Sequence, residues 1–291
     1  MPKAKTLLTR VVLGAAMIAV LAGVLVLDHR DVLASKLADI HGLLLTLAVV
    51  VLGVAAFREL RRLARAAGTD LLPIGGIVGM ILVGTFPTWR QGVPVGILLE
   101  DVWLLLGVVV LGVFAEQIAR RRVEGALVRI GATLLAVLYL GVGSALMLTL
   151  RLDRGVPVLV LFLAAVKGTD IGAYLTGILI GRHKLIPWLS PGKTWEGLLG
   201  GLAFGAAAAV GTVWLLDIPD LSLGSAAIFG AVVGLAGQFA DLCESLLKRS
   251  ARVKDSGALL PAFGGVLDVL DSPLLAAPVA YLLLTVLPQT Y

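Results

Sequence analysis

Residues 157–181 read PVLVLFLAAVKGTDIGAYLTGILIG, an apolar run long enough to cross a bilayer that still holds a lysine and an aspartate near its middle. An ionisable side chain at that depth in lipid is costly, so it normally faces a protein interior or a water-filled cavity. Lys167 and Asp170 are three residues apart and can pair on one helix face. Pairing alone would be a structural explanation, whereas the depth of the two charges favours a functional site.

The composition of the whole chain agrees with this interpretation. Apolar residues make up 59% of the sequence, charged residues only 15%, and the mean hydropathy is +1.01, values far from those of soluble domains. We predict an all-α, polytopic membrane helix bundle with about nine transmembrane helices. The expected spans are residues 8–27, 40–57, 71–88, 97–115, 128–149, 157–181, 197–216, 223–243 and 273–290.

The basic residues predict an orientation. With the N-terminus inside, 18 of the 24 lysines and arginines fall on the cytoplasmic side of these spans. The sequence therefore predicts an N-in, C-out topology with the polar segments of the second half facing the cytoplasm. Cations at membrane ends serve topology and anionic headgroups, so the lipid bilayer is an expected partner and nucleic acid is not. The single cysteine, Cys243, excludes an internal disulfide and a cysteine-based zinc cluster.

The two halves of the chain differ in their polar content. Residues 1–160 are expected to be transmembrane scaffold helices, and residues 161–291 a catalytic region with cytoplasmic loops. In the first half, Arg58 and Glu59 are interpreted as a solvated helix end, and Glu100 and Asp101 as carboxylates at a helix N-terminus. In the second half, four glycines are predicted to let helices approach closely: Gly197, Gly200, Gly201 and Gly205.

A polar loop, LSPGKTWEGLLGG at residues 189–201, precedes the seventh expected span. Ser190 and Thr194 flank a Pro-Gly turn, and Lys193 lies beside them. A lysine next to glycine and hydroxyl groups can bind phosphate, although this segment lacks the spaced glycines of a Walker A loop and does not follow a strand. Alone, the loop is weak evidence for a phosphate site.

A polar stripe ends the eighth expected span. It consists of Asp241, Glu244, Ser245 and Lys248, whose spacings of three, four and seven place them on one helix face. A solvated helix end would explain the stripe as well as a site would. Beyond a basic segment, Gly264 and Gly265 allow a tight backbone approach, and Asp268 and Asp271 follow three residues apart.

These segments together favour one kind of chemistry. Clustered carboxylates near a membrane boundary can hold magnesium, which takes carboxylate, water and phosphate oxygens as ligands. Lysine and arginine on the same segments would neutralise phosphates. Carboxylates for a metal, cations for phosphates and glycines for close approach suit phosphoryl or nucleotidyl transfer. The lipid boundary suggests that one substrate is a lipid.

The segment SLLKRSARVKDSGALLPAFGGVLDVLD, residues 245–271, resembles the signature of the phosphatidate cytidylyltransferases, also called CDP-diacylglycerol synthases. Its matching residues are Ser245, Lys248, Arg249, Lys254, Asp255, Gly257, Pro261, Gly264, Gly265, Asp268 and Asp271. Earlier matches are Asp241, Leu242 and Glu244; Ser190, Pro191, Lys193, Thr194 and Trp195; and Asp170, Ala173 and Tyr174. The resemblance covers residues 165–290. Phe263 and Val269 stand where the family has histidine and arginine, and Ala262 replaces the usual glycine.

The resemblance implies an enzyme that transfers CMP from CTP to phosphatidic acid with magnesium, in a homodimer of a bacterial cytoplasmic membrane. The implied metal ligands are Asp241, Asp268 and Asp271, and Asp170 would line the polar cavity. The implied phosphate contacts are Lys193, Lys248, Arg249 and Lys254. The hydroxyl groups of Ser190, Thr194 and Ser245 would orient the phosphates. Gly264 and Gly265 would let the backbone approach the substrate, and Asp255 would pair with a cation of the basic segment.

Three other functions stay open at this point. A cytidylyltransferase acting on another lipid phosphate, such as an isoprenoid lipid, would have the same residues. A transporter or channel would also place charges in the membrane, but it favours internal repeats and broken helices, and no repeat between the halves is evident. An inactive relative would bind an active partner. Flux in liposomes without nucleotide consumption would identify the transporter.

Overall fold

The computed structural model describes residues 19–20, 22–28, 41–92, 102–218, 221–257 and 264–287. These residues are mostly helical, as predicted, and the chain forms two compact units. The first unit comprises Met1–Leu148 and Ala251–Val269, and the second comprises Thr149–Ser250 and Leu270–Tyr291. The signature segment is therefore divided: residues 245–250, with Lys248 and Arg249, and the last aspartate, Asp271, belong to the second unit, whereas residues 251–269, with Lys254 and the glycine pair, belong to the first.

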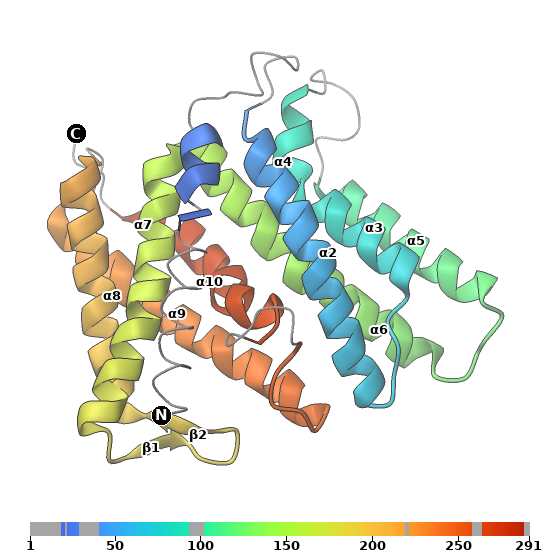
Figure 1. Cartoon of the computed structure of the whole chain (residues 1–291). Helices are drawn as coiled ribbons and strands as arrows, with labels where there is room; N and C mark the ends of the chain where they lie inside the picture. Colours follow the sequence, from blue (N-terminus) through green and yellow to red (C-terminus); the bar gives the residue numbers. More distant parts are fainter. Residues whose placement is uncertain are drawn as a thin grey trace. The chain divides into compact units, whose positions relative to one another are not determined.

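The first unit is built from short and long apolar helices (Figure 1). They are α2 (Leu43–Ala66), α3 (Pro73–Gly84), α4 (Phe86–Trp89), η2 (Arg90–Gly92), α5 (Val102–Ala119), α6 (Ala126–Val137) and η4 (Leu138–Val142). Part of its core is a cluster of Leu72, Val113 and Ile130, which comes from the segment before α3, from α5 and from α6. The backbone N–H of Leu72 also donates to Thr133 Oγ1 at 2.9 Å, and this hydrogen bond connects the start of α3 to α6.

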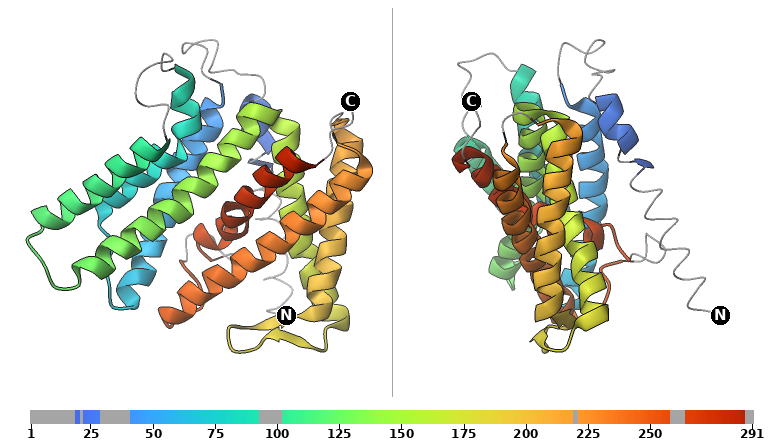
Figure 2. Two further views of the ribbon diagram at one scale, coloured as in Figure 1. Left: turned by 180° about the vertical axis from the view of Figure 1, so that it is seen from behind. Right: turned by 90° about the vertical axis from the view of Figure 1, so that its left-hand side faces the viewer.

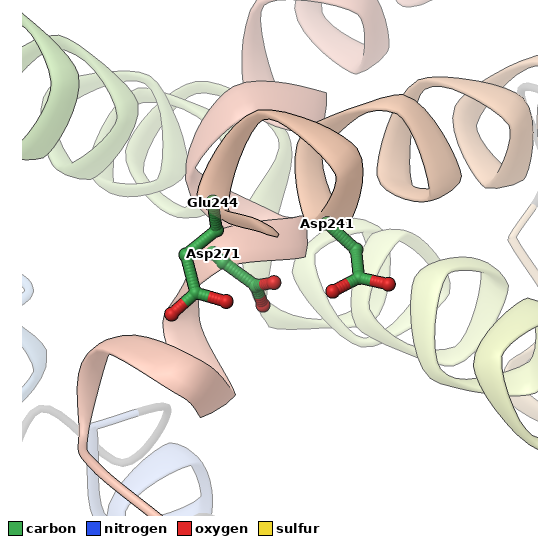
Figure 3. A group of neighbouring side chains, drawn as sticks. All are labelled: Asp241, Glu244 and Asp271. Atoms are coloured by element: carbon green, nitrogen blue, oxygen red, sulfur yellow. The ribbon is translucent and has the colours of Figure 1, made fainter. Parts of the chain in front are cut away.

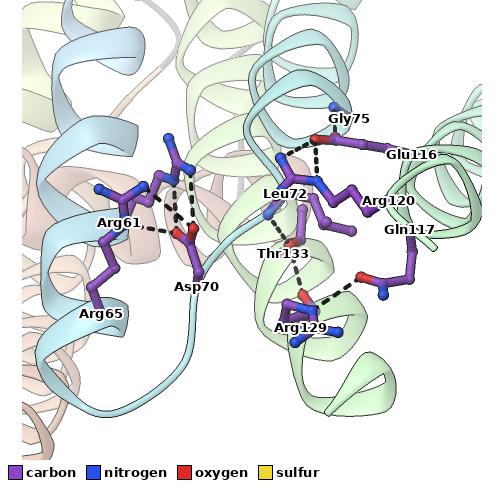
Figure 4. A network of polar contacts seen from close by, with 10 residues as sticks. All are labelled: Arg61, Arg65, Asp70, Leu72, Gly75, Glu116, Gln117, Arg120, Arg129 and Thr133. Atoms are coloured by element: carbon purple, nitrogen blue, oxygen red, sulfur yellow. Dashed lines mark hydrogen bonds and ion pairs between the residues drawn. The ribbon is translucent and has the colours of Figure 1, made fainter. Parts of the chain in front are cut away.

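Polar contacts secure both ends of the link between α2 and α3 (Figure 4). Asp70 accepts hydrogen bonds from Arg61 Nε at 2.8 Å and from Arg65 Nε at 3.0 Å. Burial alone would raise the pKa of Asp70, but the hydrogen bonds and charges of the two guanidinium groups outweigh burial and hold this pKa below its ordinary value. In the first turn of α3, Gly75 N–H donates to Glu116 at 2.6 Å.

The second unit contains the remaining elements. They are α7 (Gly143–Ile180), which begins in the first unit, β1 (Lys184–Ile186), β2 (Ser190–Thr194), α8 (Trp195–Leu216), α9 (Leu223–Ser250) and α10 (Leu267–Val286), which also begins in the first unit. Helix α7 is interrupted at Gly155, whose φ of 84° no helix accommodates, and Pro157 follows. This interruption lies between the fifth and sixth expected spans.

Helices α7, α8 and α9 pack through small residues and lie side by side (Figures 1 and 2). Thr169 of α7 occupies the space where a side chain on either Gly205 of α8 or Gly234 of α9 would lie. A Cβ at Gly201 would lie 2.9 Å from the Thr169 carbonyl oxygen. The predicted role of the α8 glycines in close helix approach is confirmed.

The segment before α8 forms a two-stranded β-hairpin, which the sequence pattern does not predict (Figure 2). Lys184 pairs with Thr194 and Ile186 with Ser190 in an antiparallel, irregular register. The expected Pro-Gly turn between Ser190 and Thr194 is wrong, because these residues form β2, and the chain reverses just before it, where Leu189 N–H donates to Ile186 O at 3.2 Å. A proline is tolerated because each strand of a two-stranded sheet is an edge strand.

Six helices in the described residues are long and apolar enough to cross a membrane, so the chain is an integral membrane protein. They are Leu43–Ala66, Val102–Ala119, Ala126–Ile180, Trp195–Leu216, Leu223–Ser250 and Leu267–Val286. The third expected span contains α3, whose 12 residues reach only about 18 Å, short of the hydrocarbon core. Most of the first expected span and both Glu100 and Asp101 lie outside the described residues. The count of nine and the orientation are thus not confirmed.

Candidate functional site

Three carboxylates from two helices of the second unit converge in what we call the acidic cluster (Figure 3). Asp241 and Glu244 lie on α9, and Asp271 lies on α10; one oxygen of each is within 4.8 Å of the others. Glu244 is 1% exposed and Asp271 is 3% exposed. Helical spacing brings the first two residues together, while the third reaches them only through the packing of α10 against α9.

Such a cluster needs positive charge nearby. Two ionised carboxylates 4.8 Å apart repel by about 3 kcal/mol at an effective dielectric constant of about 20. Lys193 Nζ lies 2.8 Å from Asp241, and Lys248 pairs with Glu244 one helical turn away. Asp271 accepts hydrogen bonds from Ser272 N–H at 2.6 Å and from the Ser272 hydroxyl at 3.3 Å. The lysines offset two charges, and a bound cation would offset the third.

A chain of polar contacts extends the acidic cluster into α7. Lys193 donates to the backbone carbonyl and side-chain oxygen of Gln238, both at 3.0 Å. The Gln238 amide donates to Asp170 at 3.0 Å, and Asp170 pairs with Lys167 at 3.3 Å, as the sequence predicts. Lys193 is therefore the residue through which the hairpin contacts both the acidic cluster and the polar group inside α7.

The hairpin is fixed in place from both sides. Thr194 caps the N-terminus of α8, where its Oγ1 accepts the Gly197 N–H at 3.1 Å. Arg249, near the end of α9, donates to the Leu189 carbonyl at 3.4 Å. Ser190 begins β2, and Ser245 follows Glu244 on α9; both are partly buried. The predicted residues of the polar loop and of the α9 stripe therefore share one end of the second unit.

The other predicted site residues belong to the first unit. Asp268 accepts three hydrogen bonds on Oδ2: from Ser256 N–H at 3.2 Å, from the Ser256 hydroxyl at 2.8 Å and from Gly265 N–H at 2.6 Å. Gly264 has a φ of 95°, and a Cβ there would lie 2.5 Å from the same oxygen. The glycine pair thus lies close to the Asp268 carboxylate, while its approach to a substrate stays a prediction.

The structure brings together two of the three predicted metal ligands and adds a third carboxylate beside them. Asp241 and Asp271 meet as expected, and their neighbour is Glu244, which the resemblance does not assign to metal. Asp268 and the exposed Lys254 and Asp255 lie in the first unit, so their roles at the acidic cluster stay predictions. A helical spacing of three from Asp241 is the signal that could have identified Glu244. Among the family departures, Val269 lies in α10, whereas residues 262 and 263 are outside the described part of the chain.

The acidic cluster fits a hard divalent cation. Its donors are carboxylate oxygens, which magnesium prefers over nitrogen or sulfur. One carboxylate oxygen of each residue lies within 4.8 Å of the other two, so the three side chains could together hold one such ion.

A cavity of about 310 Å³ lies at the other end of the second unit. Its walls come from the α7 interruption, the last residue of α8 and the end of α10, and they include Asp153, Arg154 and Asp217. None of the predicted site residues lines it.

Known proteins are similar to the chain over most of its length. The sequence model of the cytidylyltransferase family matches residues 8–287. Phosphatidate cytidylyltransferase of Brucella suis is 31% identical over 245 residues, which are 84% of this chain and 85% of that protein. The Pseudomonas aeruginosa protein of the same name is 41% identical over 183 residues, 63% of this chain and 66% of that protein.

A third phosphatidate cytidylyltransferase, from Mycobacterium leprae, is 42% identical over 124 residues, 43% of this chain. The alignments span about two fifths of the length of the mycobacterial relatives. The family match nevertheless extends through both units, and the Brucella alignment covers most of both proteins. The chain therefore belongs to the cytidylyltransferase family.

Proposed function

We propose that the protein transfers CMP from CTP to phosphatidic acid, giving CDP-diacylglycerol and pyrophosphate. The observation that carries the proposal is the acidic cluster with Lys193 and Lys248 against it, in a chain of the cytidylyltransferase family. Three carboxylates supply metal ligands, and two lysines supply charge for phosphates. The named relatives, all phosphatidate cytidylyltransferases, suggest the substrates.

The proposed reaction is one in-line displacement. A phosphate oxygen of phosphatidic acid attacks the α-phosphorus of CTP, and the bond from that phosphorus to the oxygen bridging to the β-phosphate breaks, releasing pyrophosphate. A phosphomonoester with a second pKa near 6 is largely ionised at neutral pH, so no general base is needed. Magnesium, when bound, would neutralise charge on the phosphates during the transfer. Phe263 and Val269 stand where the family has histidine and arginine, and this chemistry is compatible with both replacements.

The side chains that match the family signature would position the substrates. Asp241, Glu244 and Asp271 would hold magnesium, with Asp268 of the first unit proposed as a further ligand. Cations proposed to contact phosphates are Lys193, Lys248, Arg249 and Lys254. Hydroxyl groups proposed to orient them are those of Ser190, Thr194 and Ser245. Thr194 is 5% exposed and its oxygen accepts the hydrogen bond that caps α8, so of the three hydroxyl groups it is the most buried.

We further propose that the acidic cluster faces the cytoplasm. Trp195 and Trp214, 53% and 75% exposed, lie at the two ends of α8 about 28 Å apart, which matches the hydrocarbon thickness and the aromatic belts of a bilayer. The hairpin then lies just outside the lipid, among the cations Arg182, Lys184 and Arg249. Positive residues mark the cytoplasmic side, which supports an N-in, C-out topology and a place in the cytoplasmic membrane. A homodimer is proposed from the family resemblance alone.

The test is a transfer assay with purified protein. Detergent-solubilised protein is incubated with dioleoyl phosphatidic acid, α-labelled CTP and magnesium, and labelled lipid and pyrophosphate are measured, with ATP, GTP, UTP and dCTP as controls. We expect label in the lipid and an equal amount of pyrophosphate from CTP. Folded protein that transfers label to phosphatidic acid from none of these nucleotides would refute the proposal. Labelling of an isoprenoid phosphate instead, or ion flux in liposomes without nucleotide use, would assign the site to one of the alternatives.

A further inference from the structure

Glu59 of α2 is a buried carboxylate that reaches a segment about 200 residues away in the sequence. It is 4% exposed, so its interpretation as part of a solvated helix end is wrong. Its two oxygens accept hydrogen bonds from Val266 N–H at 3.0 Å and from Leu267 N–H at 2.9 Å, and the Ser256 hydroxyl lies 3.2 Å away. All four residues belong to the first unit.

These contacts serve the glycine loop, by which we mean residues 254–257 and 264–268. Leu267 begins α10, and the first N–H groups of a helix have no partner within the helix. The Glu59 carboxylate accepts the first of them, from Leu267, together with the N–H of Val266 just before the helix, and its charge interacts favourably with the helix dipole. Gly257 and Gly265 pack against the Glu59 carboxylate, where a Cβ on Gly257 would lie 2.6 Å from it. The loop therefore has glycines where the carboxylate needs room.

Glu59 and Asp268 act on the same part of the glycine loop. The Ser256 hydroxyl lies within hydrogen-bond distance of both carboxylates, 3.2 Å from Glu59 and 2.8 Å from Asp268, and its single hydrogen can be donated to one at a time. Burying a carboxylate is costly unless hydrogen-bond donors surround it. The start of a helix does not require such a group, because a serine, threonine or aspartate next to it in the sequence is enough to cap it. A charge supplied from another helix indicates that the exact path of this loop matters.

We propose that Glu59 is a positioning residue that holds the glycine loop, and with it Lys254, Asp255 and Asp268, in the conformation required for transfer to the lipid phosphate. The inference rests on the proposed function, because these three residues are predicted to contact phosphate or metal. Glu59 acts through the loop backbone and does not itself touch substrate.

The substitution Glu59→Gln tests the proposal. The substituted side chain keeps the shape of glutamate, but its amide group would face one of the two N–H donors, which cannot hydrogen-bond to it. We expect KM for CTP to rise and kcat to fall, together lowering kcat/KM on the order of 10–100-fold, as for other residues that orient ligands through a neighbour. Loss of folded protein alone would lower the apparent kcat and leave KM unchanged.

Glu116→Gln is the matched control. Glu116 is also a mostly buried glutamate of the first unit that accepts a backbone N–H in the first turn of a helix, from Gly75 at 2.6 Å. It is not among the predicted site residues. E116Q should lower the thermal stability about as E59Q does, while KM and kcat per folded molecule stay at the wild-type values. Wild-type kinetics in E59Q, or equal kinetic losses in both variants, would overturn the positioning role.

Hydrogen–deuterium exchange separates this proposal from the proposed function. The amides of Val266 and Leu267 should exchange faster in E59Q by on the order of tenfold and remain unchanged in E116Q, whether or not the wild type uses CTP. Should E59Q fail to fold, Ser256→Ala removes only the shared hydroxyl, and the same faster exchange with a smaller rise in KM is expected. Unchanged exchange of Val266 and Leu267 in E59Q, or in S256A if E59Q does not fold, would overturn the inference. Absent transfer by the wild type would refute the proposed function alone.

Discussion

Replacing Asp271 by asparagine tests whether the acidic cluster binds metal, because the substitution keeps the side-chain shape and removes one charge. Asp271 is 3% exposed, and a carboxylate oxygen lies within 4.8 Å of those of Asp241 and Glu244. Each such pair of ionised groups repels by about 3 kcal/mol at an effective dielectric constant of about 20. Lys193 and Lys248 offset part of this repulsion. Without divalent cations we therefore expect D271N to be more stable than the wild type by about 1–3 kcal/mol.

Magnesium should reverse this order. A ligand that binds only the folded protein stabilises it by about 2.7 kcal/mol at 100 times Kd, and D271N would lose most of this gain. The assay is the apparent Tm of detergent-purified protein, first with EDTA and then along a magnesium titration, where 1 kcal/mol corresponds to about 2–4 °C. Transfer activity of D271N should fall by at least about 100-fold, since residues that only orient metal ligands already account for 10–100-fold.

Asp70→Asn is the control for this experiment. Two arginines neutralise Asp70 in the first unit, so its loss should lower Tm slightly and by the same amount with and without magnesium. The metal-site reasoning is refuted if D271N is less stable than the wild type in EDTA and magnesium raises the Tm of both proteins equally. In that case the acidic cluster would be a structural group held by its lysines.

Three further predictions test separate parts of the structure. Lys193→Met should raise KM for CTP at least about tenfold in steady-state kinetics, because a charge-assisted phosphate contact is lost; an unchanged KM would contradict the phosphate role. Gly205→Ala should lower Tm, since overpacking against Thr169 costs about 1–3 kcal/mol, whereas Gly211→Ala, with no atom near its Cβ position, should not. Because the pKa of Asp70 is lowered in the folded state, its stabilising effect is present above the unfolded pKa of about 4 and lost below it, so the Tm difference between wild type and D70N should be constant near neutrality and shrink in acid.

Hydropathy predicted most of the helices because a membrane helix needs a long apolar run, and such runs are readable residue by residue. It was less reliable for α3, where Pro73 begins and Gly84 ends a helix too short to span lipid. It also missed the hairpin, since three residues of β1 and five of β2 give no period long enough to distinguish strand from loop. Errors in the fold therefore concentrate where elements are short.

The candidate site was predictable to the extent that its residues share one helix. The stripe on α9 follows from spacing, and the Lys167–Asp170 pair follows from three-residue separation within α7. The contacts of Lys193 with Asp241 and Gln238 join residues about 45 positions apart, and no periodicity encodes them. Only the order of motifs in the family resemblance suggested that these segments meet.

Glu59 shows why local sequence cannot decide between a solvated and a buried carboxylate. A glutamate between Arg58 and Leu60 looks like a helix end in water, and Arg58 is indeed exposed. What makes burial possible is a set of donors on the glycine loop, because a buried charge needs several hydrogen bonds to offset lost hydration. The sequence signal for this contact is in the glycine loop, where Gly257 and Gly265 leave room for the carboxylate. Glycines beside a predicted catalytic loop can therefore indicate a distant acidic side chain as well as a bound substrate.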